Sequence, residues 1–172
     1  MRLFIGTSLD PEKIPPLQQA TSTLLRNETW RAAPAEQWHV TALFIGERPS
    51  GDLEAIKAHV KRIAKGTPPI MLRNGWLCTT PKSAPRMLWV RFEPSADLNS
   101  LHHTLATALN AEPSKHYPYI PHITLARTKG SSGEVDGPLL LPELRLDRIT
   151  LFQTELHPAG SIHHPLATWK LK

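Results

Sequence analysis

Two short segments of the sequence combine an imidazole with a hydroxyl at the same spacing. His39 and Thr41 lie in HVTALF, and His122 and Thr124 lie in HITLAR, 83 positions further along the chain. Histidine gains and loses a proton near neutral pH because its unperturbed pKa is about 6.5. A threonine hydroxyl donates a hydrogen bond to an oxygen, such as a non-bridging oxygen of a phosphate. Together these residue types indicate acid–base chemistry on a phosphate group.

Such chemistry requires the side chains to share a face, and a strand provides this. Residues i and i+2 of a strand point to the same side of the sheet. If two such strands faced each other, one imidazole would deprotonate a nucleophile while the other protonated a leaving group. Each transfer would accelerate the reaction about 10²- to 10⁴-fold. The hydroxyls would hold the phosphate between the imidazoles, in line for the displacement.

A third His-x-Thr pattern shows that the pattern alone is weak. His102 and Thr104 belong to HHTL, which lies inside a predicted helix. Positions i and i+2 of a helix point about 200° apart, so this pair does not converge on one ligand. We predict that His102 and His103 lie on the helix surface or at the edge of the core. The chemical hypothesis therefore depends on the matched pair of strand motifs.

The elements around the two motifs occur in the same order, which indicates an internal duplication. A strand over 2–9 precedes a helix that starts at Asp10, as a side-chain cap, and Pro11. A strand over 86–92 precedes a helix over 95–110, and a shift of 83 positions aligns these elements with the first set. We expect two similar lobes related by a pseudo-twofold axis, with the motif strands face to face.

The remaining elements complete an α+β chain. Apolar residues at helical spacing after Ser50, a candidate cap, predict a helix that ends at Gly66. Apolar and β-branched runs predict strands over 69–77, 143–154 and 166–171. The length of 172 residues favours one well-packed domain over residues 1–172.

Composition limits the functional classes. No apolar run approaches the ~20 residues that span a bilayer, so we expect no membrane association. Cys78 is the sole cysteine, which excludes an intrachain disulfide and a zinc site with two cysteines. The formal net charge of +5 favours anionic partners such as nucleic acid. A cytoplasmic location is expected.

The motifs and their flanks resemble a known family. The chain is similar to the 2H phosphoesterases, and within them to the LigT-like RNA 2′,3′-cyclic phosphodiesterases, also described as 2′-5′ RNA ligases. The segments that carry the resemblance are RLFIGTSLDP, HVTALFIGE, PHITLAR, RITLFQTEL and HPLATWKL. It implies an α+β fold in which two antiparallel sheets form a concave cleft and helices pack outside. It also implies that a 2′,3′-cyclic phosphate, at an RNA end or in a small nucleotide, is opened to a 2′-phosphomonoester without metal or cofactor. We expect a monomer.

The resemblance also assigns roles to residues. His39 corresponds to the proton donor and His122 to the proton acceptor, an assignment that spacing does not supply because the two half-sites look alike. The implied contacts are Thr41, Thr124 and Arg127 for the phosphate and Phe44 for the nucleobase. Phe44 and Arg127 each follow a motif histidine by five positions, and regular alternation would turn them to the opposite face. Either each strand twists or bulges there, or these two residues lie outside the site.

Three alternative functions remain open. RNA joining as the main activity would use the same site by microscopic reversibility. A non-catalytic module would bind RNA ends in the same cleft without turnover. A metallohydrolase would use the late histidines, which we interpret instead as surface residues: His157, His163 and His164. The aromatic residues before the second motif either stack on a base or anchor their loop: His116, Tyr117 and Tyr119.

Overall fold

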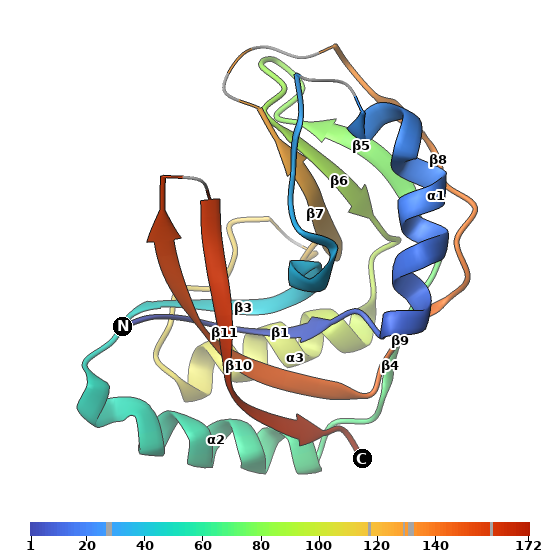
Figure 1. Cartoon of the computed structure of the whole chain (residues 1–172). Coiled ribbons are helices and arrows are strands. Elements are labelled where there is room, and N and C mark those ends of the chain that lie inside the picture. The colour runs from blue at the N-terminus through green and yellow to red at the C-terminus, as the bar shows by residue number, and fades with distance from the viewer. Residues whose placement is uncertain (27–28, 117, 129, 131–132, 159) are drawn as a thin grey trace.

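Two antiparallel halves of a sheet meet edge to edge in this protein. The computed structural model describes residues 1–26, 29–116, 118–128, 130, 133–158 and 160–172, so Tyr117 lies outside the described residues. One half has the strand order β11-β10-β1-β3, the other has the order β7-β6-β5-β8, and β3 pairs with β7 through Val40 and Ile123 alone. Figure 1 shows the two halves set at an angle, with the β10–β11 hairpin standing opposite β6 and β7.

The strands fall into three groups. The first half consists of β1 (Arg2–Ser8), β3 (His39–Glu47), β10 (Arg148–His157) and β11 (Gly160–Lys170). The second half consists of β5 (Trp76–Thr80), β6 (Met87–Arg91), β7 (His122–Arg127) and β8 (Asp136–Pro138), with β2 (Arg31–Ala32) paired to β7. A separate two-stranded sheet consists of β4 (Ile70–Leu72) and β9 (Leu144–Leu146). The motif strands β3 and β7 are therefore the inner edges of the two halves.

Helices cover the outer faces and leave the concave side open. The helices are α1 (Ile14–Leu25), α2 (Leu53–Lys65) and α3 (Ala96–Ala108), with short 3-10 turns η1 (Pro11–Lys13), η2 (Ala35–Gln37) and η3 (Ser50–Asp52). In Figure 1, α2 and α3 lie along the first half, and α1 lies beside the second. This arrangement confirms the predicted α+β fold with external helices, and the two predicted antiparallel sheets are the two halves that join at β3 and β7.

The predicted apolar stripes explain the helix packing. Ile56 and Val60 of α2 are buried, as are Leu98, Leu101 and Leu105 of α3. These positions recur every three or four residues, so each helix turns one side toward the sheet. The core lies between these stripes and the outer face of the strands.

Two predicted side-chain caps are wrong. Asp10 and Ser50 do not cap a helix through their side chains, because a 3-10 turn precedes each α-helix: Asp10 lies just before η1, and Ser50 is the first residue of η3. The Asp10 carboxylate instead accepts a hydrogen bond from Arg148 at 2.9 Å, which ties the start of this segment to β10. Ser95, by contrast, accepts from the Leu98 N–H at 3.2 Å and caps α3.

Three predicted strand boundaries are also wrong. The strand predicted over 69–77 is divided into β4 and β5 at Asn74, whose φ of 52° lies in the left-handed region. The strand predicted over 143–154 is divided into β9 and β10. The strand predicted over 166–171 is β11, which starts at Gly160. β11 is an edge strand, and an edge tolerates Pro165, which a central strand would not.

Within the described ranges, each helix is too short or too polar to cross a bilayer.

Candidate active site

The edge-to-edge meeting of β3 and β7 brings the two motifs together. Val40 pairs with Ile123, and each is the middle residue of its motif, buried toward the helices. Alternation along a strand then directs the flanking residues to the concave face. His39, Thr41, His122 and Thr124 line a single cleft of about 690 Å³. The convergence expected from the internal duplication is therefore present in the geometry.

A β-bulge in each motif strand decides where Phe44 and Arg127 point. On β3, Ala42 has no partner on β1, because Thr41 pairs with Gly6 and Leu43 pairs with Ile5. On β7, Leu125 is skipped in the same way between its neighbours that pair with β6. Ala42 and Leu125 each lie three positions after the motif histidine, and both are buried. One extra residue reverses the alternation, so the bulged-strand alternative is correct.

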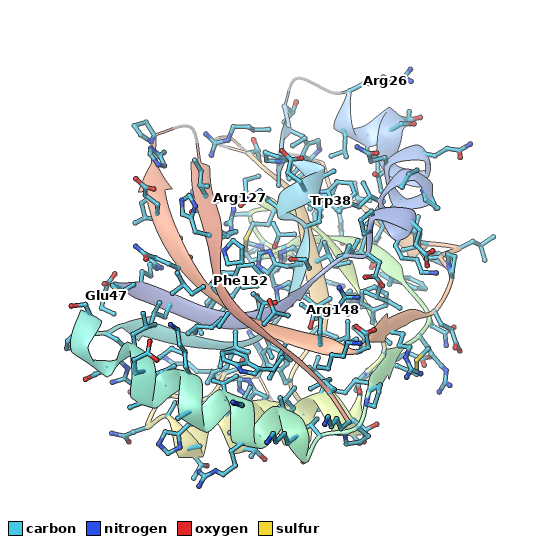
Figure 2. All side chains as sticks on the ribbon, turned by 60° about the horizontal axis from the view of Figure 1, so that its bottom comes forward. Arg26, Trp38, Glu47, Arg127, Arg148 and Phe152 are labelled. Carbon is cyan, nitrogen blue, oxygen red and sulfur yellow. The ribbon has the colours of Figure 1, made fainter. Side chains whose placement is uncertain are left out.

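Both predicted accessory residues consequently line the cleft. Phe44 leaves 63% of its surface exposed, so a flat apolar face is open to a ligand at the mouth. Arg127 is exposed, and its Nη1 lies 3.1 Å from Met87 Sδ. Figure 2 shows Arg127 and Phe152 on the concave side beside the β10–β11 hairpin, whereas Trp38 lies toward α1. The two positions are equivalent under the shift of 83 residues, with an aromatic ring in one half and a guanidinium in the other.

The backbone fixes the tautomer of both motif histidines. Nδ1 of His39 lies 2.7 Å from the Gln37 carbonyl oxygen, and Nδ1 of His122 lies 2.9 Å from the Ile120 carbonyl oxygen. A carbonyl oxygen only accepts, so each Nδ1 carries a proton and donates. Nε2 is then the ring atom available for proton transfer in both histidines. The same contact, to the residue two positions earlier, occurs in both halves.

The cleft is cationic. Arg2, Arg31 and Arg127 line it together with the histidines, and no described residue of the lining carries a carboxylate. Arg31 belongs to β2 and pairs with Arg127 of β7, so two guanidinium groups come from adjacent strands. Clefts with one sign of charge concentrate ligands of the opposite sign. This lining therefore suits a phosphate-containing ligand.

A family comparison agrees with this geometry. The family model described as the 2′-5′ RNA ligase superfamily matches residues 9–158, a span that contains both motifs. The chain belongs to this superfamily. Two curated relatives are named RNA 2′,3′-cyclic phosphodiesterase. The one from Thermus thermophilus is 29% identical over all of this chain and 91% of its own length. The one from Thermotoga maritima is 26% identical over 96% of this chain and 93% of its own length.

Two solved structures share the whole fold. A crystal structure of a Thermus thermophilus protein superposes with a TM-score of 0.86 and 28% identity, and covers 99% of this chain and 98% of the other. Escherichia coli LigT in apo form superposes with a TM-score of 0.82 and 22% identity, and covers 99% and 96% of the two chains. The bilobal arrangement thus extends over the full length of this superfamily member.

Burial lowers the pKa of both motif histidines. For His39, desolvation is the largest cause, the hydrogen bond to Gln37 opposes it, and the charges of His122 and Arg127 lower the pKa further. For His122, desolvation is again the largest cause, the bond to Ile120 opposes it, and Arg127 and His116 add to the lowering. The free protein therefore favours two neutral imidazoles. An anion bound between them would raise both pKa values.

Aromatic rings from the strands next to the motif strands support the two imidazoles. The Trp89 ring stacks on His122, with centroids 3.9 Å apart and planes at 19°. The Phe4 ring lies 4.9 Å from His39 at 36°. Trp89 also pairs with Thr124 across the two strands. Neither Phe4 nor Trp89 follows from the motif, because the pairing register of β1 and β6 is needed to place them.

The third His-x-Thr pattern has a structural role. His102 is buried rather than on the surface or at the edge of the core, and its Nδ1 donates to the Ala42 carbonyl oxygen at 2.7 Å. Its Nε2 accepts from the Ser114 N–H at 2.9 Å. Tyr119 stacks on His102 and donates its hydroxyl to the Thr41 carbonyl oxygen at 3.0 Å. Tyr119 is thus a loop anchor. His102 and Tyr119 together bind the backbone carbonyl oxygens of Ala42 and Thr41 at the bulge of β3.

The late histidines do not behave as one group. His157 and His164 each contact the Glu155 carboxylate at 3.2 Å, and both are exposed as predicted, although His157 also lines the cleft. His163 was predicted on the surface and lies instead in the cleft, half-buried, with its ring centroid 5.0 Å from that of His39. This position was not predicted because β11 was expected to start after it. In the described part of the chain, no three His, Cys, Asp or Glu side chains are grouped to hold a metal.

Proposed function

We propose that this superfamily member hydrolyses a terminal 2′,3′-cyclic phosphate of RNA to a 2′-phosphomonoester. One observation carries the proposal: two bulged His–Thr strands meet in antiparallel register in a cationic cleft. Relatives named RNA 2′,3′-cyclic phosphodiesterase align with nearly the whole chain and support the same substrate. The positive lining fits the charge of RNA.

The reaction is an in-line displacement at phosphorus. Nε2 of His122 takes a proton from water as the water oxygen bonds to phosphorus. The bond from phosphorus to the 3′ oxygen breaks, and Nε2 of His39 gives its proton to that oxygen. The 2′ oxygen keeps the phosphate, and the two imidazoles exchange protonation states. Each transfer contributes about 10²- to 10⁴-fold to the rate.

The other residues hold the substrate. The hydroxyls of Thr41 and Thr124 donate to the non-bridging oxygens, and Arg127 offsets their negative charge. Phe44 stacks on the terminal base with its exposed ring. Binding of the anionic phosphate raises the pKa of both histidines, which supplies the protonated His39 that the free protein disfavours.

RNA joining is the second candidate, because the matched superfamily is named for it. A 5′-hydroxyl would replace water as the nucleophile, and the same 3′ oxygen would leave, so the product would contain a 2′-5′ linkage. A short RNA with a 2′,3′-cyclic phosphate, incubated with and without an RNA bearing a free 5′-hydroxyl, separates the two. We expect mainly the 2′-phosphate, identified by its ³¹P resonance. Mainly joined product would favour the ligase, and tight binding without turnover would favour an RNA-end-binding module.

A further inference from the structure

A third imidazole lies against the His39 half of the site. The His163 ring on β11 stands edge-on to His39, with centroids 5.0 Å apart and planes at 80°. It also stands edge-on to Phe4 at 4.9 Å. Phe4 and His163 thus contact His39 from two strands, β1 and β11. The His122 half is built differently, with one large ring stacked flat on the imidazole.

Hydrogen bonds connect His163 to the backbone that holds His39. The backbone N–H of His163 donates to Gln37 Oε1 at 2.8 Å, and the Gln37 carbonyl oxygen accepts from His39 Nδ1 at 2.7 Å. Gln37 therefore joins the two histidines through both its side chain and its backbone. The Thr154 hydroxyl, on the partner strand, lies 3.1 Å from His163 Nδ1 and fixes the orientation of the ring. A movement of the hairpin would be transmitted to His39.

The His163 ring is neutral at neutral pH. Burial is the largest cause of its lowered pKa of about 4, followed by the charges of His39, Arg127 and His164. A neutral ring at this place excludes water from His39 without repelling its protonated form. The other groups that face His39 are His122 and Arg127 from β7, whereas β1 and β10 present the apolar Phe4 and Phe152.

We propose that His163 is a positioning residue for His39. Its ring edge and the Gln37 bridge fix the His39 imidazole and shield it from water. The proposal depends on the proposed function only in that His39 transfers a proton; the restraint on the ring does not require turnover. Displacing a reacting group by about 1 Å costs about 100-fold in rate, so a loosened ring has a measurable effect.

The test compares His163→Ala, which removes the ring, with His163→Phe, which keeps it. The matched control is His164→Ala, because His164 is adjacent in sequence but binds Glu155. The His39 ring is titrated by ¹H–¹⁵N NMR, assigned with His39→Ala, and kcat/KM is measured on an RNA 2′,3′-cyclic phosphate. We expect His163→Ala to raise the pKa of His39 by about 0.5 unit or more, as water reaches the ring. We expect kcat to fall about tenfold with little change in KM.

His163→Phe is expected to keep the pKa of His39 and to restore kcat to within about threefold of wild type. His164→Ala is expected to match wild type. Equal losses in the Phe and Ala variants would overturn the proposal, since a ring nitrogen and not the ring would then be required. An unchanged His39 pKa in His163→Ala would overturn it as well. If His163→Ala does not fold, Gln37→Met tests the other part of the restraint, because it removes the bond to the His163 backbone N–H and keeps the His163 ring. A wild-type kcat and an unchanged His39 titration in Gln37→Met would then overturn the proposal.

The two proposals fail in different ways. If the wild-type protein does not open the cyclic phosphate, the proposed function is wrong, and the NMR titration still tests the restraint on His39. If the wild type is active and the titration of His39 does not respond to His163→Ala, the positioning role is wrong and the proposed function stands.

Discussion

Replacing Gly6 with alanine tests whether the spacing between β1 and β3 sets the geometry of the first motif. Gly6 pairs with Thr41, and a Cβ there would lie 2.7 Å from the Val40 carbonyl oxygen and 3.4 Å from Thr41 Cα. Both atoms belong to the backbone, so no side-chain rotation relieves the contact. The strand that carries His39 and Thr41 must move by at least 0.3 Å before the closest contact reaches 3.0 Å.

The expected cost of Gly6→Ala follows from this displacement. Overpacking of this kind destabilises a protein by about 1–3 kcal/mol. A shift of about 0.3 Å at the reacting groups should lower kcat/KM about fourfold, given about 100-fold per ångström. Urea unfolding and the rate on an RNA 2′,3′-cyclic phosphate measure the two effects separately, at a temperature where circular dichroism shows the variant folded.

Gly51→Ala is the matched control. A Cβ at Gly51 meets no atom within 4 Å, and this residue lies in the turn before α2, outside the residues that line the cleft. We expect its stability to stay within about 1 kcal/mol of wild type and its rate to be unchanged. Wild-type rate and stability in Gly6→Ala, or the same effect of both substitutions, would show that the spacing between β1 and β3 does not set this geometry.

Four further outcomes are expected. Tyr119→Phe removes the hydrogen bond to the bulge of β3 and should cost about 1 kcal/mol in urea unfolding, with a loss of kcat. Arg127→Gln should raise KM for the cyclic phosphate more than it lowers thermal stability, because the side chain is exposed and its charge faces the cleft. Because the pKa of His39 is lowered, the fall of kcat/KM with rising pH should begin below the ordinary titration range of histidine, while the kcat profile lies at higher pH because bound phosphate raises the pKa values of both motif histidines. His163, with a folded pKa of about 4 against about 6.5 unfolded, contributes stability above pH 6.5 that is lost on acidification toward pH 4. Because solvent screens this half-buried ring, the loss should amount to about 1–2 kcal/mol in urea unfolding, and His163→Phe should remove it.

The internal duplication explains why much of the fold could be predicted. A repeated strand–helix–strand order requires two similar halves, and the His–Thr spacing orients four side chains once the segments are strands. The apolar stripes of the helices could also be predicted from the sequence. Ile56 and Val60 of α2 lie four positions apart, as do Leu101 and Leu105 of α3, which is the spacing of one helix face.

The parts of the fold and site that could not be predicted depend on how the strands pair, which no local sequence pattern encodes. The bulges at Ala42 and Leu125 arise from the register with β1 and β6, and they turn Phe44 and Arg127 into the cleft. β11 has few strand signals because it is an edge strand that contains Pro165, so His163 could not be assigned to the site. His163 and His164 are adjacent and equivalent in sequence. Only their positions on β11, whose successive residues point to opposite faces, show that His163 faces the cleft and His164 does not.

In the proposed reaction, one imidazole from each half acts on the same phosphate. The most direct measurement is the rate at which an RNA 2′,3′-cyclic phosphate is opened in the presence of EDTA by wild type, His39→Ala and His122→Ala. We predict turnover by wild type to a 2′-phosphate, and a loss of at least about 100-fold in each variant. Loss of the wild-type activity in EDTA would contradict the account, as would a variant that keeps the wild-type rate.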